Sequence, residues 1–191
     1  SLRRAFSQRV RLSTDDWEML RHHCGYLRLT RGAHFIHRGE VAKYVAFVTH
    51  GMLRFYYATT EGKTFNKEFV SEGDFVLSLS SHVTGEPVKY SIEALEDCRL
   101  ITLRYDRLKY LAETSSDWQA LLLRWTEQAF IKKDEKEAYF LLNTPRQRYQ
   151  RFCIDFPKLE QRLTDYHIAA YLGITPVSLS RIKRSLIEAR R

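Results

Sequence analysis

An uninterrupted helical pattern between Ser116 and Leu142 constrains the fold of this chain more than any other feature. No proline or glycine occurs in this stretch, and its apolar residues recur at spacings of three and four. We expect one helix of about 25 to 28 residues, roughly 40 Å long at 1.5 Å per residue. Because this exceeds what a small β-domain can cover, we expect the helix to pair with a second copy of the chain. The expected seam consists of Trp118, Leu121, Leu122, Trp125 and Ala129. The alternative is a helix that packs only on its own β-domain.

The chain before this helix, from Tyr26 to about Leu103, has the composition of β-strands. Short runs of Val, Ile, Phe, Tyr and Thr are separated by glycines. In residues 53–69 the residue types alternate with a period of two, as on the two faces of a strand, on each side of the turn sequence TTEGK. This pattern predicts a hairpin with Gly62 at a position of positive φ. Several such strands without intervening helices indicate a sandwich or a small barrel. A short helix capped by Ser13 and ended by Gly25 is expected ahead of them.

The end of the chain has the pattern of two short helices joined by a tight turn, which follows a further helical region after Pro145. Thr164 is placed to cap the first of the two, and Gly173 ends it. Thr175 is placed to cap the second, with Pro176 at the first helical position, where a missing N–H costs nothing. This order is typical of a helix-turn-helix unit.

The second of these helices has two different faces. Leu179, Ile182 and Leu186 form an apolar stripe, while hydroxylic and basic residues occupy the opposite side. From Pro145 onward the chain has ten basic residues, Arg190 and Arg191 included, against four acidic ones, so +6 of its net charge of +8 lies there. We therefore expect this helix to enter the major groove of double-stranded DNA.

Each residue on the exposed side has an expected role. Arg181 is the candidate for bidentate contact with guanine, and Pro176 and Val177 are candidates for contact with a thymine methyl group. The whole expected set is Thr175, Pro176, Val177, Ser178, Ser180, Arg181, Lys183 and Arg184, in which the hydroxyls and Lys183 are placed for phosphates. The alternative is a basic surface helix that binds no nucleic acid.

Cysteine content and apolar runs exclude several classes of protein. Cys24, Cys98 and Cys153 are odd in number and lack metal-ligand spacing, which argues against a disulfide scaffold or a structural zinc site. No run approaches the roughly 18 apolar residues of a membrane span, and residues 1–10 have no apolar segment of a signal peptide. We expect a cytoplasmic protein with no membrane partner and no cofactor.

A metal-dependent enzyme of the cupin type is an alternative, because the strand-rich region contains His34, His37, His50 and Glu40. His34 and His37 are three apart in a strand-like run, so we expect them to point to opposite faces, whereas the cupin pattern has two histidines separated by one intervening residue. No Ser-His-Asp set, phosphate-binding loop or dinucleotide fingerprint is present. We therefore expect neither a metal site nor enzymatic activity.

The sequence LTDYHIAAYLGITPVSLSRIKRSL resembles the DNA-binding region of the Crp/Fnr family of bacterial transcription regulators. The order of parts is similar along nearly the whole chain, including the barrel turns GE and EGDF. The resemblance implies an α+β fold: an N-terminal antiparallel β-barrel or jelly roll like cyclic-nucleotide-binding domains (1–112), a long dimerisation helix (113–144), and a helix-turn-helix domain (145–191) without an evident wing. It also implies a homodimer that binds inverted-repeat DNA.

The chain departs from the members of this family that bind cyclic AMP. Aligned from GDF, their Gly-Glu pair for the ribose corresponds to Leu77 and Ser78, and their Arg-Ser pair for the phosphate to Val88 and Lys89. A cyclic phosphate needs a placed cation, so we expect a regulator that cyclic AMP does not control. The remaining candidate partners are RNA polymerase and an unidentified small effector in a pocket formed by Arg54, Lys67, Ser78, Ser80 and Lys89. The alternative function is a sensing or protein-interaction barrel with only weak or non-specific DNA binding.

Overall fold

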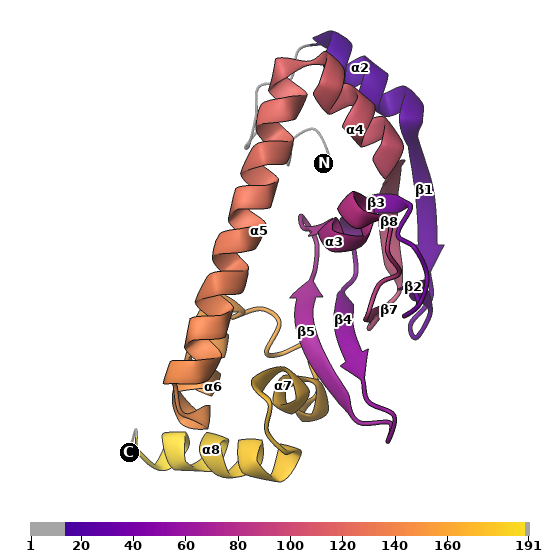
Figure 1. The fold of residues 1–191 in the computed structure, drawn as a ribbon. Coiled ribbons are helices and arrows are strands. Elements are labelled where there is room, and N and C mark those ends of the chain that lie inside the picture. The colour runs from indigo at the N-terminus through magenta and orange to yellow at the C-terminus, as the bar shows by residue number, and fades with distance from the viewer. Residues whose placement is uncertain (1–13, 190–191) are drawn as a thin grey trace. The chain divides into compact units, whose positions relative to one another are not determined.

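The computed structural model describes residues 14–189, so the expected cap Ser13 and the basic residues Arg190 and Arg191 lie outside the described residues. The helices are α2 (Thr14–His23), α3 (Leu79–Thr84), α4 (Tyr105–Thr114), α5 (Ser116–Leu142), α6 (Pro145–Asp155), α7 (Asp165–Leu172) and α8 (Pro176–Glu188) (Figure 1). The strands are β1 (Cys24–Leu29), β2 (His34–Ile36), β3 (Tyr44–His50), β4 (Leu53–Ala58), β5 (Thr64–Val70), β6 (Phe75–Val76), β7 (Ser91–Ala94) and β8 (Cys98–Arg104).

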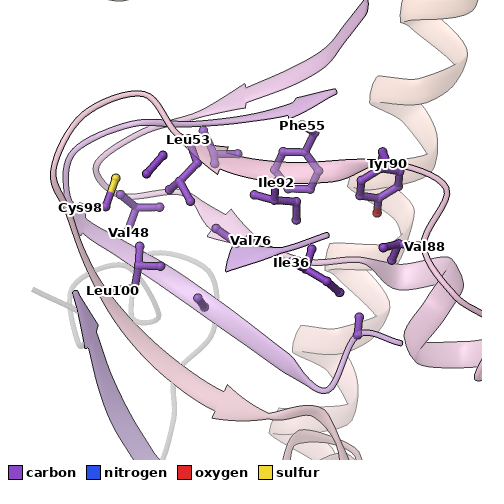
Figure 2. Packing of buried hydrophobic residues seen from close by; sticks show 14 residues of the cluster. Ile36, Val48, Leu53, Phe55, Val76, Val88, Tyr90, Ile92, Cys98 and Leu100 are labelled. Carbon is purple, nitrogen blue, oxygen red and sulfur yellow. The ribbon is translucent and has the colours of Figure 1, made fainter. Parts of the chain in front are cut away.

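The strands form two four-stranded sheets, with the orders β1-β8-β3-β6 and β2-β7-β4-β5. The pairs in register, such as β1 with β8 and β4 with β7, are antiparallel. Alternate side chains point between the sheets, where Phe55, Ile92 and Leu100 are at most 2% exposed (Figure 2). Burying one such side chain contributes about 1.5–3 kcal/mol. The expected α+β class and antiparallel β-domain are thus present.

The hairpin predicted from alternation is confirmed. β4 and β5 flank a turn in which Gly62 has a φ of 80°, in the left-handed region that glycine adopts without strain. The predicted long helix is confirmed as well, because α5 spans the whole stretch without proline or glycine.

The described residues fall into two compact units, one formed by 14–56 with 68–129 and the other by 57–67 with 130–189. In the first unit, α2, α4 and the N-terminal half of α5 pack on the outer face of the sheet that contains β3 and β8. Trp118, Leu121 and Trp125 of α5 are at most 7% exposed in this cluster, and Leu122 packs against it. This corresponds to the alternative in which these positions of the helix pack on their own β-domain.

The second unit contains α6, α7 and α8. Its core includes Phe152, Ile168, Ala169, Leu172 and Leu179, each at most 1% exposed. No helix in residues 14–189 has the length and apolar run needed to cross a lipid bilayer.

Candidate functional site

The geometry of α7 and α8 is fixed by caps at each helix end. The Thr164 hydroxyl accepts from the His167 N–H at 3.4 Å, and the Thr175 hydroxyl accepts from the Ser178 N–H at 3.2 Å. Gly173 ends α7 with a φ of 70°, and its N–H donates to the Ala169 carbonyl. Because only three residues separate the two helices, this left-handed glycine sets the direction in which α8 begins.

Helix α8 has one packed face and one exposed face, as its sequence predicts. Leu179 is buried and Ile182 and Leu186 are half-buried. On the other side Val177 is 63% exposed, and Pro176, Ser180, Arg181 and Arg184 are also exposed. Within residues 14–189 the guanidinium groups of Arg181 and Arg184 make no hydrogen bond or ion pair. These cations are therefore available to an anionic partner.

Three of the expected DNA-contacting residues have internal partners. The hydroxyls of Thr175 and Ser178 lie 3.0 Å apart and form the cap of α8, while Ser178 is half-buried. The Lys183 ammonium donates to the Asp165 carboxylate at 2.6 Å. Lys183 lies four residues after Leu179, so its position at the rim of the packed stripe follows from helical spacing.

A contact that the sequence does not indicate joins the first residues of β5 to α7 within the second unit. The Asn66 side chain is 4% exposed, and its amide donates to the His167 carbonyl at 2.8 Å. The hydroxyls of Thr64 and Tyr166 lie 2.9 Å apart. The partners in these pairs are about 100 residues apart in the chain, a separation at which sequence periodicity carries no information.

A second element holds the hairpin in this unit. The Lys136 ammonium of α5 donates to the carbonyl of Lys67 and lies 4.1 Å from the centroid of the Tyr171 ring. Cation and ring attract each other at this distance. The first residues of β5 are therefore bonded to both α5 and α7.

The residues expected to form an effector pocket each have different surroundings. Arg54 is 8% exposed, and its guanidinium lies 2.6 Å from the Glu93 carboxylate. Ser78 is buried at the start of α3, Lys67 is half-buried, and Ser80 and Lys89 are exposed. Because Glu93 neutralises Arg54, Lys89 is the exposed cation of this set.

The positions that the gapless alignment from GDF pairs with the cyclic-AMP ligands are mainly apolar or buried. Leu77 packs against the cluster formed with α5, and Val88 is 3% exposed in the core between the sheets. A buried valine supplies no charge to a phosphate.

The expectation that His34 and His37 point to opposite faces is wrong. Their rings stack with centroids 4.2 Å apart, and His34 Nε2 lies 3.0 Å from the Tyr56 hydroxyl. The strand β2 ends at Ile36 and has a register irregularity after His34, so two-residue alternation does not extend to His37. Burial is the main cause that lowers the pKa of His34, and the neighbouring His37 lowers it further. Among the residues that the structure describes, no three His, Cys, Asp or Glu side chains gather as a metal ion would need.

Comparison with known proteins finds a family model that is similar to the β-domain. The family model for the cyclic nucleotide-binding domain matches residues 26–115. No curated protein sequence matches the chain.

Several solved structures share the fold along most of the chain. FixK2 from Bradyrhizobium japonicum is 19% identical with a TM-score of 0.76, over 87% of this chain and 85% of that one. CLP from Xanthomonas campestris, a global regulator responsive to cyclic di-GMP, is 15% identical with a TM-score of 0.72, over 93% of both chains. A mutant of CooA from Carboxydothermus hydrogenoformans is 16% identical with a TM-score of 0.72, over 88% and 78%.

Proposed function

We propose that this chain, whose residues 26–115 match the family model for the cyclic nucleotide-binding domain and whose fold is similar to those of FixK2 and CooA, is a transcription regulator of the Crp/Fnr type that acts as a homodimer and binds inverted-repeat DNA. The observation that supports this most strongly is the exposed face of α8. It presents Arg181 and Arg184, which have no hydrogen-bond or ion-pair partner among residues 14–189, next to the exposed side chain of Val177. Guanidinium groups read guanine or bind phosphate, and an apolar side chain suits a thymine methyl group.

The dimer is proposed to form along the outer face of α5 rather than through the residues expected from the sequence. Leu123, Phe130 and Leu141 are 58%, 69% and 77% exposed. They follow one another at spacings of 7 and 11 residues, which places them on one line of a helix, on the side away from Trp118 and Trp125. Pairing two such lines would cover three large apolar side chains per subunit.

Cyclic AMP is not the proposed effector. The alignment from GDF pairs Val88 with the phosphate-binding arginine; Val88 is buried, and the adjacent Lys89 is exposed. An effector of another kind and contact with RNA polymerase remain part of the proposal.

Substitution of Arg181 tests the proposed base contact. Arg181→Ala should lower affinity for the selected DNA site by about 1–3 kcal/mol and relax discrimination at one base pair per half-site, because a bidentate guanine contact is lost. Fluorescence anisotropy with the selected and a scrambled duplex measures both effects. Arg146→Ala removes one exposed cation from α6 and serves as the matched control. Equal losses on both duplexes would mean that Arg181 contacts phosphate only.

A further inference from the structure

Two adjacent cations of α8 have different surroundings. Arg184 is exposed and makes no ion pair with the described residues. The side chain of Lys183 is only 28% exposed and points to the packed side of the helix. By charge alone the two would have the same role, so their environments must decide it.

Lys183 lies between two carboxylates from separate parts of the unit. Its ammonium is 2.6 Å from Asp165 Oδ1, in the first turn of α7, and 3.9 Å from Glu160 Oε1, in the loop after α6. Glu160 Oε1 also accepts from the Tyr149 hydroxyl of α6 at 2.6 Å. The ammonium lies 5.7 Å from the centroid of the Tyr149 ring. Four side chains thereby connect α6, the loop, α7 and α8.

This arrangement has two physical consequences for Lys183. Its charge faces two carboxylates, so an approaching phosphate meets a cation that is already neutralised. The ion pairs with Asp165 and Glu160 hold Lys183 on the packed side of α8 and so fix the rotation of α8 about its own axis. Arg184, the next residue, then lies about 100° further around the helix. A small rotation of α8 would move Arg181 off the base edge that it reads.

We propose that Lys183 is a positioning residue of the DNA interface, which orients α8 through Asp165 and Glu160, whereas Arg184 supplies the phosphate contact. The proposal rests on the proposed function. It predicts that Lys183 affects specific binding without affecting the number of phosphates neutralised.

The salt dependence of binding separates the two roles. Specific and random duplexes are measured by anisotropy between about 50 and 200 mM salt. Lys183→Met, which keeps the apolar stem, should weaken specific binding about five- to ten-fold, leave random binding within about two-fold, and leave the salt slope unchanged. Arg184→Met is the matched comparison: it should weaken both duplexes and reduce the slope by about 2 for a dimer, since each phosphate contact contributes about 0.9.

Two further variants test the route through Asp165. Lys183→Arg keeps a cation within reach of both carboxylates and should restore specific affinity to within about two-fold of the wild type. Asp165→Asn should reproduce the loss seen in Lys183→Met, and the double variant should lose no more than either single variant, because the two residues act as one unit. Fully additive losses would overturn the proposal, as would a salt slope that falls in Lys183→Met as it does in Arg184→Met.

Hydrogen exchange without DNA separates failure of this inference from failure of the proposed function. Lys183→Met should raise amide exchange in residues 176–188 by about five-fold, and Arg184→Met should not. If the exchange result holds but the wild type binds no duplex, the positioning contact stands and DNA binding is wrong. If the wild type binds DNA but Lys183→Met leaves exchange unchanged, the positioning role is wrong.

Discussion

Phe130→Glu is expected to convert the dimer to a monomer and to abolish binding to an inverted repeat. Phe130 is 69% exposed at the middle of the outer line of α5. In the proposed dimer the substitution places a carboxylate from each subunit in an apolar seam. An uncompensated buried charge costs about 3–5 kcal/mol, which corresponds to more than a hundred-fold loss of dimer affinity. Sedimentation velocity measures the mass, and DNA binding follows in parallel.

The matched control for Phe130→Glu is Gln128→Glu. Gln128 is exposed on the same helix, and two residues earlier means about 200° around the helix axis from Phe130. It should leave the dimer intact while adding the same charge. A dimer that persists in Phe130→Glu would place the subunit contact elsewhere.

Trp118→Ala is expected to destabilise the β-domain by about 3–5 kcal/mol, because it removes a large side chain from a packed core and leaves a cavity. Trp118 is fully buried in the cluster with Leu108 and Leu121. Denaturant unfolding followed by circular dichroism measures the change in the free energy of unfolding. Gln119→Ala, at an exposed neighbouring position, should change it by less than about 0.5 kcal/mol. If Trp118→Ala were as stable as Gln119→Ala but monomeric, the tryptophan would belong to the seam after all.

The sequence predicts those helices and turns that are determined by residues close to one another in the chain. The length of α5 follows from a stretch without proline or glycine, and the start of α8 follows from Thr175 and Pro176. The hairpin around Gly62 follows from alternation and one turn residue. These features depend on neighbours in the chain, which a sequence displays directly.

Features set by partners distant in the chain could not be predicted in the same way. The apolar residues of α5 are visible in the sequence, but which of its two apolar faces meets the β-domain depends on where α2 and α4 pack. The contact between Asn66 and His167 has no periodic signature. The stacking of His34 on His37 depends on the end of β2 and a register irregularity.

Within α8 as well, the sequence predicts which face is exposed but not which cations form ion pairs. Arg181 falls on the exposed face by spacing alone, and the structure places it there. Spacing also places Lys183 at the rim of the packed stripe, but its ion pairs with Asp165 and Glu160 join separate parts of the chain and are visible only in the structure. Charge patterns identify a basic helix, whereas the role of each cation depends on the carboxylates near it.

Sequence-specific DNA binding is measured by selecting bound duplexes from a random DNA pool with the purified wild-type protein. The selection is run at about 0.1 M salt without an added effector, with Arg181→Ala in parallel. We expect enrichment of an inverted repeat with half-sites about 34 Å apart, or a multiple of this distance, as a two-fold dimer requires. Arg181→Ala should select the same repeat with a weaker base preference at one base pair per half-site. Binding that is sensitive to salt but enriches no sequence would mean that the wild-type protein is not a sequence-specific regulator under these conditions.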